Sequence, residues 1–344
     1  MSTAGDARVR RLAPESVDLT EFASLLTSEL EHEYLLLLVP YGLEAHAPSL
    51  AAGRLIRSRL AATAAGLLSD RLIRRCAALE MMHTSTLIHD DILDRGTVRR
   101  GLPTLWKAVG RERALLIGNL VAARALAIAQ ADSAEAANVF LETWQRVNVA
   151  QLREVNERGR VKDRAAHVGI SIGKASAAME LGLVIGCMSS PGWPVDLTHL
   201  REAVREFGLG FQFADDVEDV RAWLGASGPR RSKEAEFDID LGNLTLPVTI
   251  LAESAGVRFE PAGRRSVQVL RALSLEDWEP CLQATFRIAL DHLDRARWHL
   301  DRAEEFSGDR ELARRVIDWA DEMIESVRRK GLDMTLSELP QVAR

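Results

Sequence analysis

The sequence predicts an all-α protein that forms one large helical bundle. Apolar residues recur at the three- and four-residue spacing of a helix face, and turn-forming clusters interrupt them roughly every 20 to 30 residues. No stretch alternates apolar and polar residues with β-branched enrichment, as a half-buried strand would. The 344 residues, 47% of them hydrophobic, are enough for a large core. We expect residues 1–14 to be disordered and residues 15–344 to form a single domain.

Helical periodicity predicts the elements of the first half of the chain in order. Their expected ranges are 16–39, 49–68, 70–90 and 111–130. Pro48 opens the second helix, which is expected to hold Gly53 to Arg57 in its first turns. Ser69 or Asp70 caps the third helix, which ends at an acidic segment. The fourth is almost purely Ala, Leu and Ile, which indicates burial on most faces.

The second half continues the pattern. Its expected helices cover residues 134–158, 163–188, about 196–219, 246–252, 275–306 and 309–329. Ser133, Asp163 and Asp196 are the predicted N-caps. Residues 224–240 form the one long predicted loop, rich in Gly and charge, which we interpret as a mobile lid beside a charged site.

Composition excludes several classes of protein. A net charge of -6 argues against general nucleic-acid binding. The three cysteines, Cys76, Cys187 and Cys281, lie far apart in apolar contexts, so they are expected to be buried thiols of a cytoplasmic protein. No segment reaches 18 uninterrupted apolar residues and no signal peptide is evident, so neither a transmembrane segment nor secretion is expected.

Two Asp-Asp-x-x-Asp motifs carry the chemistry. Their aspartates are Asp90, Asp91 and Asp94 in the first and Asp215, Asp216 and Asp219 in the second. Aspartates four residues apart share one helix face, where they repel each other unless a cation lies between them. Carboxylate oxygens with remaining positions for water and phosphate suit Mg²⁺. One motif alone could be a solvated helix end, but two predict helices that clamp a metal cluster and a diphosphate.

Around these motifs the sequence resembles the trans-polyprenyl diphosphate synthase family over about residues 50–250. The family's Arg-Arg-Gly-x-Pro-Thr stands here at Arg99 to Thr104, and its Phe-Gln-x-x-Asp-Asp-x-x-Asp at Phe211 to Asp219. The resemblance implies the isoprenoid synthase bundle with a central cavity, and a homodimer with residues 111–130 at its interface. It also implies a Mg²⁺-dependent prenyltransferase that joins isopentenyl diphosphate to an allylic diphosphate.

The resemblance also assigns roles. About three Mg²⁺ ions polarise the leaving diphosphate, so the C–O bond breaks to an allylic cation that isopentenyl diphosphate attacks. By resemblance, Asp90 and Asp94 ligate two ions and Asp215 the third, with Asp91, Asp216 and Asp219 in support. The allylic diphosphate would be bound by Arg99, Lys174, Gln212 and Lys233. Isopentenyl diphosphate would be bound by Arg54, Arg57, His83 and Arg100. Arg54 and Arg57 could instead be a solvated helix face, and His83 a core histidine.

Three departures from the family pattern affect phosphate-binding positions. The usual Gly-Lys-x-x-Arg-Pro is Gly53-Arg54-Leu55-Ile56-Arg57-Ser58, which keeps both charges but loses the lysine and the proline. Ala175 stands where threonine is frequent, and Asn243 replaces a lysine. Each change weakens phosphate binding without removing a predicted metal ligand, so we expect activity.

The residues before Asp90 predict product length. Ser85 and Thr86 lie roughly 6 to 7.5 Å along the helix from the carboxylates, at ~1.5 Å per residue. Family members that stop at fifteen carbons usually carry an aromatic residue at this level, so two small residues predict about twenty carbons or more. Met81 and Met82, one turn deeper, either block growth there or bend aside.

Two other functions remain open from the sequence. A class I terpene cyclase on the same fold would ionise a diphosphate but need no isopentenyl diphosphate site, and the retained His83 and Arg100 favour elongation instead. A non-catalytic subunit of a heteromeric synthase would tend to lose an acidic motif, whereas both motifs are intact.

Overall fold

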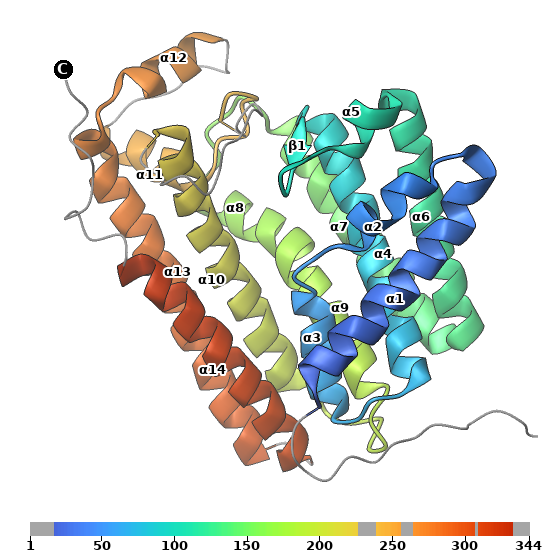
Figure 1. Ribbon diagram of the computed structural model, residues 1–344. Helices are drawn as coiled ribbons and strands as arrows, with labels where there is room; N and C mark the ends of the chain where they lie inside the picture. Colours follow the sequence, from blue (N-terminus) through green and yellow to red (C-terminus); the bar gives the residue numbers. More distant parts are fainter. Residues whose placement is uncertain (1–16, 226–238, 256–263, 307–308, 333–344) are drawn as a thin grey trace, which may run out of the picture. The chain divides into compact units, whose positions relative to one another are not determined.

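The computed structural model describes residues 17–225, 239–255, 264–306 and 309–332. Within these ranges the chain is helical apart from turns and one two-stranded hairpin, which confirms the all-α prediction (Figure 1). The α-helices are α1 (Leu19–Leu38), α2 (Ala47–Ala51), α3 (Ile56–Ala65), α4 (Asp70–Leu93), α5 (Leu105–Val109), α6 (Arg111–Asp132), α7 (Ala134–Asn156), α8 (Arg164–Ser171), α9 (Ala177–Cys187), α10 (Thr198–Trp223), α11 (Leu246–Ala255), α12 (Arg264–Ala272), α13 (Leu275–Phe306) and α14 (Arg310–Leu332). The shorter elements are η1 (Val39–Tyr41), η2 (Glu44–His46), β1 (Val98–Arg99), β2 (Leu102–Pro103) and η3 (Ile172–Ser176).

The chain divides into two compact units. The first comprises residues 1–146, 177–201 and 300–319, and the second residues 147–176, 202–299 and 320–344. Helices α7, α10, α13 and α14 contribute residues to both units. The prediction of a single domain stays a prediction.

Helix α4 is the central element of the first unit. It packs most extensively against α6 and also contacts α1, α3 and α9 (Figure 1). Most of its first three turns and the middle of the helix are buried, as the apolar run predicted. The α4–α6 contact is close because Gly118 has no side chain: a Cβ there would lie 2.5 Å from Nε2 of His89. The acidic end of α4 is therefore held by a tightly packed helix pair.

Three predicted N-caps are confirmed. Ser69 accepts a hydrogen bond from the backbone N–H of Leu72 at 3.2 Å, and Asp163 accepts one from Ala166 at 2.7 Å. Ser133 accepts one from Ala136 at 3.1 Å. Each side chain satisfies a backbone donor that the first turn of a helix leaves without a partner.

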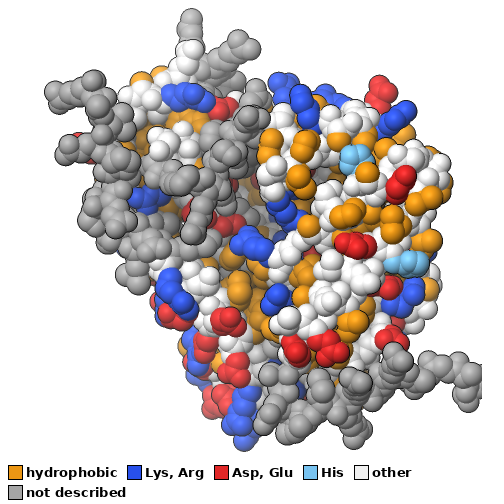
Figure 2. Space-filling model, viewed as in Figure 1, with side chains coloured by type: hydrophobic (Ala, Val, Ile, Leu, Met, Phe, Trp, Pro, Cys, Tyr) orange, Lys and Arg blue, Asp and Glu red, His pale blue; other side chains and the backbone are white. Residues whose placement is uncertain are grey.

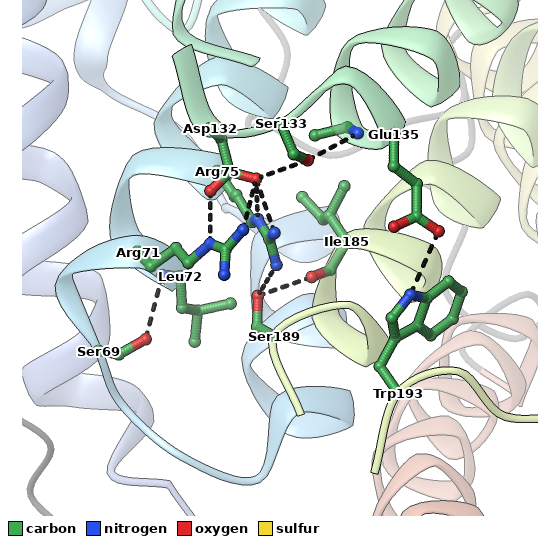
Figure 3. Close-up of polar contacts among 11 residues, drawn as sticks. Ser69, Arg71, Leu72, Arg75, Asp132, Ser133, Glu135, Ile185, Ser189 and Trp193 are labelled. Atoms are coloured by element: carbon green, nitrogen blue, oxygen red, sulfur yellow. Dashed lines mark hydrogen bonds and ion pairs between the residues drawn. The ribbon is translucent and has the colours of Figure 1, made fainter. Parts of the chain in front are cut away.

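Ionic and polar contacts join α4 to α6 and α9 at the end opposite the acidic segment (Figure 3). The Arg75 side chain is 3% exposed and donates to Oδ2 of Asp132 from NH2 at 2.6 Å. Its NH1 donates to Oγ of Ser189 at 2.9 Å, and that hydroxyl donates to the carbonyl of Ile185 at 2.8 Å. A buried guanidinium is costly without partners, so this network stabilises the base of the first unit.

Three expected elements were wrong in detail. The helix expected over 49–68 is interrupted between α2 and α3, and Leu55 there is left-handed with φ 53°. The helix expected over 163–188 contains a π-helical turn at Ile172–Ser176. A short antiparallel hairpin pairs β1 with β2 where no strand was expected. All three irregularities lie at motif positions, where a local rule of sequence is most often broken for function.

The second unit is built on close contacts among α8, η3, α10, α11 and α13. A Cβ at Gly208 of α10 would lie 2.6 Å from Oγ of Ser176, and one at Gly210 would lie 2.7 Å from the Leu293 side chain of α13. Phe213 and Trp278 are almost completely buried in this unit. The glycines allow α10 to pack closely beside the π-helical turn and α13.

Two helical segments are long and apolar enough to cross a membrane by length and composition, Arg111–Asp132 and Arg164–Cys187. Core helices pass the same test, so these segments carry no assignment to a membrane. Hydrophobic side chains are exposed on the face of the first unit that carries α1 (Figure 2).

Candidate functional site

The first acidic segment forms the C-terminal end of α4. Asp94 is the C-cap residue, and its N–H donates to the carbonyl of Asp90 at 2.7 Å. Both residues are partly exposed, whereas Asp91 between them is buried. Asp90 and Asp94 are therefore one helical turn apart, as their four-residue spacing predicted. Two carboxylates thus lie at the exposed end of a helix, where the macrodipole adds negative potential.

Asp91 is bound to Arg99. Nε and NH2 of the arginine donate to Oδ1 of Asp91 at 3.1 and 2.8 Å, and Nε also lies 3.0 Å from Oδ2. Burial raises the pKa of Asp91, and the hydrogen bonds and charge of Arg99 oppose that rise. Gly96 leaves room for this carboxylate, because a Cβ there would lie 3.2 Å from Oδ1. The pair fastens the hairpin of β1 and β2 to the end of α4, which fits a supporting role for Asp91.

Three of the four residues predicted to bind isopentenyl diphosphate, Arg57, His83 and Arg100, lie near the buried carboxylate of Glu80 in the same unit. The fourth, Arg54, lies near Arg57 and Arg100. Ser58 Oγ donates to Oε1 of Glu80 at 2.6 Å. Burial raises the pKa of Glu80, and the charges of Arg57 and Arg100 oppose the rise. Arg100 also lies against Gly53, since a Cβ there would be 3.5 Å from its NH2.

His83 lies one turn along α4 from Glu80 and is partly buried. Burial holds the pKa of His83 well below its ordinary value, and the charges of Arg57, Arg99 and Arg100 lower it further. The imidazole is therefore neutral at pH 7 and offers hydrogen bonds rather than charge. The structure brings His83 close to Arg57 and Arg100 of its predicted group.

The second acidic segment lies on α10 in the second unit. Asp215 and Asp219 are partly exposed and four residues apart, and Asp216 is buried. Oδ1 of Asp216 accepts a hydrogen bond from Nε2 of Gln212 at 3.0 Å. Gln212, predicted to contact the allylic diphosphate, thus holds the buried aspartate in this structure.

Lys174 lies in the π-helical turn η3 of the second unit. Its Nζ donates to Oε2 of Glu154 on α7 at 2.5 Å. A π-helical turn inside a helix often marks a functional position, because it displaces the side chains of one turn. Lys233, the other lysine predicted to bind the allylic diphosphate, lies outside the described residues.

The donor set fits Mg²⁺. The partly exposed aspartates of the two motifs offer carboxylate oxygens, which are hard ligands of the kind that Mg²⁺ prefers. Zinc sites are instead built mainly from cysteine and histidine. Within the described ranges, no three His, Cys, Asp or Glu residues form a complete metal-binding group. Mg²⁺ keeps several waters and is usually bound through one or two carboxylates plus substrate phosphates.

The four candidate chain-length residues differ in their surroundings. Ser85 is fully buried against α6, and its Oγ donates to the carbonyl of Gly118 at 2.7 Å. Thr86 is only partly buried, and its Oγ1 donates to the carbonyl of His83 at 2.7 Å. Met81 and Met82 are buried one turn deeper. Ser85 therefore points to α6, whereas the Thr86 hydroxyl is bonded within its own helix.

Sequence reasoning missed four polar residues of these groups. Glu80 and Ser58 form the buried pair beside the arginines, and Glu154 binds Lys174. Lys162 is buried, with Nζ 3.5 Å from Oδ1 of Asn243, where the family usually has lysine. A glutamate within the apolar run of α4 was the only signal available for Glu80, and only tertiary contacts identify the others.

The fold and these groups define an all-α protein of the isoprenoid synthase type. The family model for polyprenyl synthetase matches residues 43–260, more than half of the chain. The chain therefore belongs to the polyprenyl synthetase family, which confirms the resemblance found in the motifs.

Two relatives with known names are similar to this chain over part of their length. The chain is 31% identical over 211 residues to the putative geranylgeranyl pyrophosphate synthase 8, chloroplastic, of Arabidopsis thaliana, with 56% of this chain and 57% of the relative covered. It is 30% identical over 201 residues to the octaprenyl diphosphate synthase of Escherichia coli, covering 55% and 58%. The chain thus spans under two thirds of these relatives.

The crystal structure of polyprenyl synthase from Caulobacter crescentus, complexed with calcium and isoprenyl diphosphate, matches with a TM-score of 0.67. Identity is 22%, and 89% of this chain and 94% of that chain are covered. At this identity the match shows the shared fold alone.

Proposed function

We propose that the chain is a Mg²⁺-dependent trans-prenyltransferase that extends an allylic diphosphate with isopentenyl diphosphate. The observation that carries the proposal is the group of arginines around Glu80, together with two intact aspartate motifs. A chain that only ionised one diphosphate would need the aspartates but not a second, metal-independent cationic group. Arginine suits that group because its charge is permanent and its two nitrogens match phosphate oxygens.

Each proposed role follows from a group already described. In the first unit, Asp90 and Asp94 would hold Mg²⁺, and Arg54, Arg57, His83 and Arg100 would bind isopentenyl diphosphate. In the second unit, Asp215 would hold Mg²⁺, and Lys174 would bind the allylic diphosphate. Asp91, Asp216 and Asp219 would support the ligands. The bound ions would stabilise the charge that develops on the leaving diphosphate.

The decisive experiment incubates the purified chain with labelled isopentenyl diphosphate and an allylic diphosphate, with and without Mg²⁺. Metal-dependent incorporation, lost in Asp90→Asn and in Asp215→Asn, supports the proposal. Release of diphosphate from geranylgeranyl diphosphate without isopentenyl diphosphate would instead identify a cyclase. Incorporation that requires another protein would identify a subunit of a heteromeric synthase.

We also propose that the product has about twenty carbons or more. The support is the absence of a large side chain at Thr86, one turn before Asp90, since Ser85 points to α6 instead. The names of the relatives range from geranylgeranyl to octaprenyl diphosphate synthases, which is compatible with this lower limit. Chromatography of the dephosphorylated products measures the length directly.

A homodimer formed through α6 is the third part of the proposal. Leu115, Leu116 and Leu120 of this helix are 47%, 61% and 40% exposed. Glu33 of α1 accepts from Nε of Arg124 at 2.6 Å, which joins α1 to α6. Leu36 of α1 is 53% exposed, so exposed apolar side chains occur on both joined helices.

Light scattering on the purified chain tests the dimer. Leu116→Glu combined with Leu120→Glu should convert it to monomers, because two charges would be buried in an apolar contact. The matched control is Glu112→Ala on the exposed first turn of α6. A monomeric wild-type chain at micromolar concentration would contradict this part.

A further inference from the structure

The hairpin of β1 and β2 carries an arginine at a turn position that usually holds asparagine, aspartate or glycine. Its two-residue turn consists of Arg100 and Gly101, whose φ values are 54° and 77°. Two positive φ values are typical of a type I′ turn, in which a long side chain at the first position is strained. Such strain persists only where surrounding contacts enforce it, and it is concentrated at functional sites.

The Arg100 guanidinium lies beside the segment that precedes α3. A Cβ at Gly53 would be 3.5 Å from NH2 of Arg100 and 3.7 Å from its NH1. Arg54 directly follows Gly53, and Arg57 is the second residue of α3. The guanidinium is therefore next to the backbone that carries two other residues of the proposed isopentenyl diphosphate site. Because Arg100 is at the tip of the hairpin, this placement depends on how the hairpin is held.

Three hydrogen bonds close the base of the hairpin. The Gly96 carbonyl accepts two of them, from Oγ1 of Thr104 at 2.6 Å and from Nε1 of Trp106 at 2.7 Å. In the third, the N–H of Thr104 donates to the carbonyl of Thr97 at 3.0 Å. The N–H of Gly96 donates to the carbonyl of Asp91 on α4 at 2.9 Å. Both polar groups of the Gly96 backbone are thus bonded, and they join the hairpin to the end of α4.

The hairpin depends on these contacts because its own strands are short. Each strand has two residues, and a two-stranded hairpin is marginally stable at best in water. The left-handed conformation of Arg100 makes it less stable still. Thr104 is 2% exposed, and Trp106 belongs to α5 and packs against the core of the first unit. The two donors to Gly96 are therefore themselves fixed by packing.

We propose that Thr104 and Trp106 are positioning residues for isopentenyl diphosphate: their hydrogen bonds to the Gly96 carbonyl hold the hairpin so that Arg100 presents its guanidinium to the diphosphate. This inference rests on the proposed function. In this role neither residue touches the substrate, and both act through the hairpin. A guanidinium that is placed before binding loses less conformational entropy when it binds, so affinity depends on the contacts at the base.

A purely structural role for the same contacts makes a different prediction. Breaking hydrogen bonds to a carbonyl would then lower stability without a selective effect on one substrate. Two measurements separate the roles. Hydrogen exchange of the amides of residues 97–102 shows, without any substrate, whether the hairpin is held. Isothermal titration of the full chain with isopentenyl diphosphate alone measures binding.

Four variants supply the comparison. Trp106→Phe removes the N–H donor and keeps an aromatic ring, and Thr104→Val removes the hydroxyl and keeps the shape. Thr104→Ser restores the hydroxyl and is the conservative rescue. Trp193→Phe is the matched control, because Nε1 of Trp193 donates to Oε1 of Glu135 at 3.2 Å elsewhere in the same unit.

Trp106→Phe and Thr104→Val should both speed hydrogen exchange in residues 97–102. Each should also weaken binding of isopentenyl diphosphate and raise its KM about tenfold, with kcat and the allylic KM within about twofold of wild type. Thr104→Ser should bind within about twofold of wild type. The control should leave both the exchange of the hairpin and the binding of isopentenyl diphosphate unchanged.

Arg100→Asn tests the meaning of the strained turn. Asn-Gly is the sequence that a type I′ turn favours, so this variant should keep or raise the Tm. It should also weaken binding of isopentenyl diphosphate by more than about tenfold, because the guanidinium is gone. A lower Tm with unchanged binding would mean that Arg100 supports the fold instead, and would overturn the inference.

The remaining outcomes are equally decisive. Wild-type affinity in Trp106→Phe and Thr104→Val, or an equal loss of affinity in Trp193→Phe, would overturn the positioning role. Unchanged hydrogen exchange in both variants would also overturn it, since the contacts would not hold the hairpin. If the wild-type chain binds isopentenyl diphosphate but does not extend prenyl chains, the proposed function fails and the binding constants still decide the positioning role. A wild-type chain that does not bind isopentenyl diphosphate overturns both.

Discussion

Nζ of Lys174 donates to Oε2 of Glu154 at a distance of 2.5 Å, with 27% of the lysine side chain and 14% of the glutamate side chain exposed. The lysine that the family motif assigns to the allylic diphosphate is thus paired with a carboxylate of the same unit. A diphosphate that binds Lys174 must compete with Glu154 for this ammonium group. If Lys174 binds the allylic diphosphate as proposed, breaking this pair is part of the cost of that binding.

We predict that Glu154→Gln lowers the KM for the allylic diphosphate roughly three- to tenfold. The amide keeps a hydrogen-bond acceptor for Lys174 but removes the competing charge, a difference of about 1 kcal/mol. Steady-state kinetics with varied allylic substrate measure it. Glu157→Gln is the control, because Glu157 directly follows α7 and pairs with the exposed Arg153 of that helix. A higher KM in Glu154→Gln would mean that the carboxylate orients the lysine instead.

The second prediction concerns product length. Thr86→Phe should shorten the products, because the residue is partly buried one turn before Asp90 and a phenyl ring would fill the space beside it. Thr86→Val, which matches the threonine in size, should leave product length unchanged. Radio-chromatography of dephosphorylated products measures the change. Unaltered length in Thr86→Phe would contradict a position beside the growing chain.

Ser85→Phe is expected to behave differently from Thr86→Phe. Ser85 is fully buried and bonded to the backbone of α6, so a phenyl ring would separate α4 from α6. We expect a loss of folded protein rather than a shorter product, measurable by circular dichroism. From the sequence the two positions were equivalent, and only the tertiary contact distinguishes them.

Local sequence was enough to predict much of the fold. The caps at Ser69 and Asp163 and the bounds of α13 were predicted correctly, because capping and helical periodicity depend on residues a few positions apart. The interruption before α3 was missed, since nothing local requires Leu55 to be left-handed. Packing of α3 on α9 is a long-range contact, which the local sequence does not encode.

The sequence predicts those candidate residues that belong to a short motif, but not their partners from distant parts of the chain. Asp90 and Asp94 come one helical turn apart from spacing alone, whereas Ser58 and Glu80 are 22 residues apart and Lys174 and Glu154 are 20 apart. Such partners depend on how helices pack, which one sequence does not specify. Glu80 and Glu154 lie beside predicted residues, so the motifs predicted candidate residues but not the contacts that surround them.

The third prediction tests the packing of α3 on α9. A Cβ at Gly186 would collide with the carbonyl oxygen of Ala61, which is backbone and unable to move aside. Gly186→Ala should therefore lower the free energy of unfolding by roughly 1 to 3 kcal/mol. Urea denaturation measures the difference.

Gly169→Ala is the matched helical control. Its Cβ would lie 3.0 Å from NH1 of Arg153, the end of a flexible side chain that can move. Alanine has the higher helix propensity, so this change should be neutral or stabilising by up to about 1 kcal/mol. Equal stability of Gly186→Ala and wild type would show that α3 and α9 are not in close contact.

The fourth prediction concerns acid stability of the second unit. Oε2 of Glu206 on α10 lies 2.7 Å from Nδ1 of His292 and accepts from Nε of Arg295 at 2.9 Å, both on α13. Burial would raise the pKa of Glu206, but these partners outweigh it and lower the pKa to about 2 from 4.5. Because the folded chain holds this proton less tightly than the unfolded chain, the contribution is complete above pH 4.5. It is lost as the pH falls from 4.5 to 2.

Glu206→Gln should therefore lower the free energy of unfolding at pH 7 by about 1 to 2 kcal/mol, since solvent screens part of the pair. The difference from wild type should shrink as the pH falls from 4.5 towards 2, because the wild-type carboxylate is then protonated as well. Glu202→Gln is the control: Glu202 lies one turn earlier on α10, its side chain is 42% exposed, and it pairs with Arg205 at 3.4 Å. Denaturation curves at pH 7, 4 and 3 measure the free energy of unfolding of wild type, Glu206→Gln and Glu202→Gln. A pH-independent difference between Glu206→Gln and wild type would mean that the side chain acts through packing, because only the loss of an ionised group can couple stability to protons.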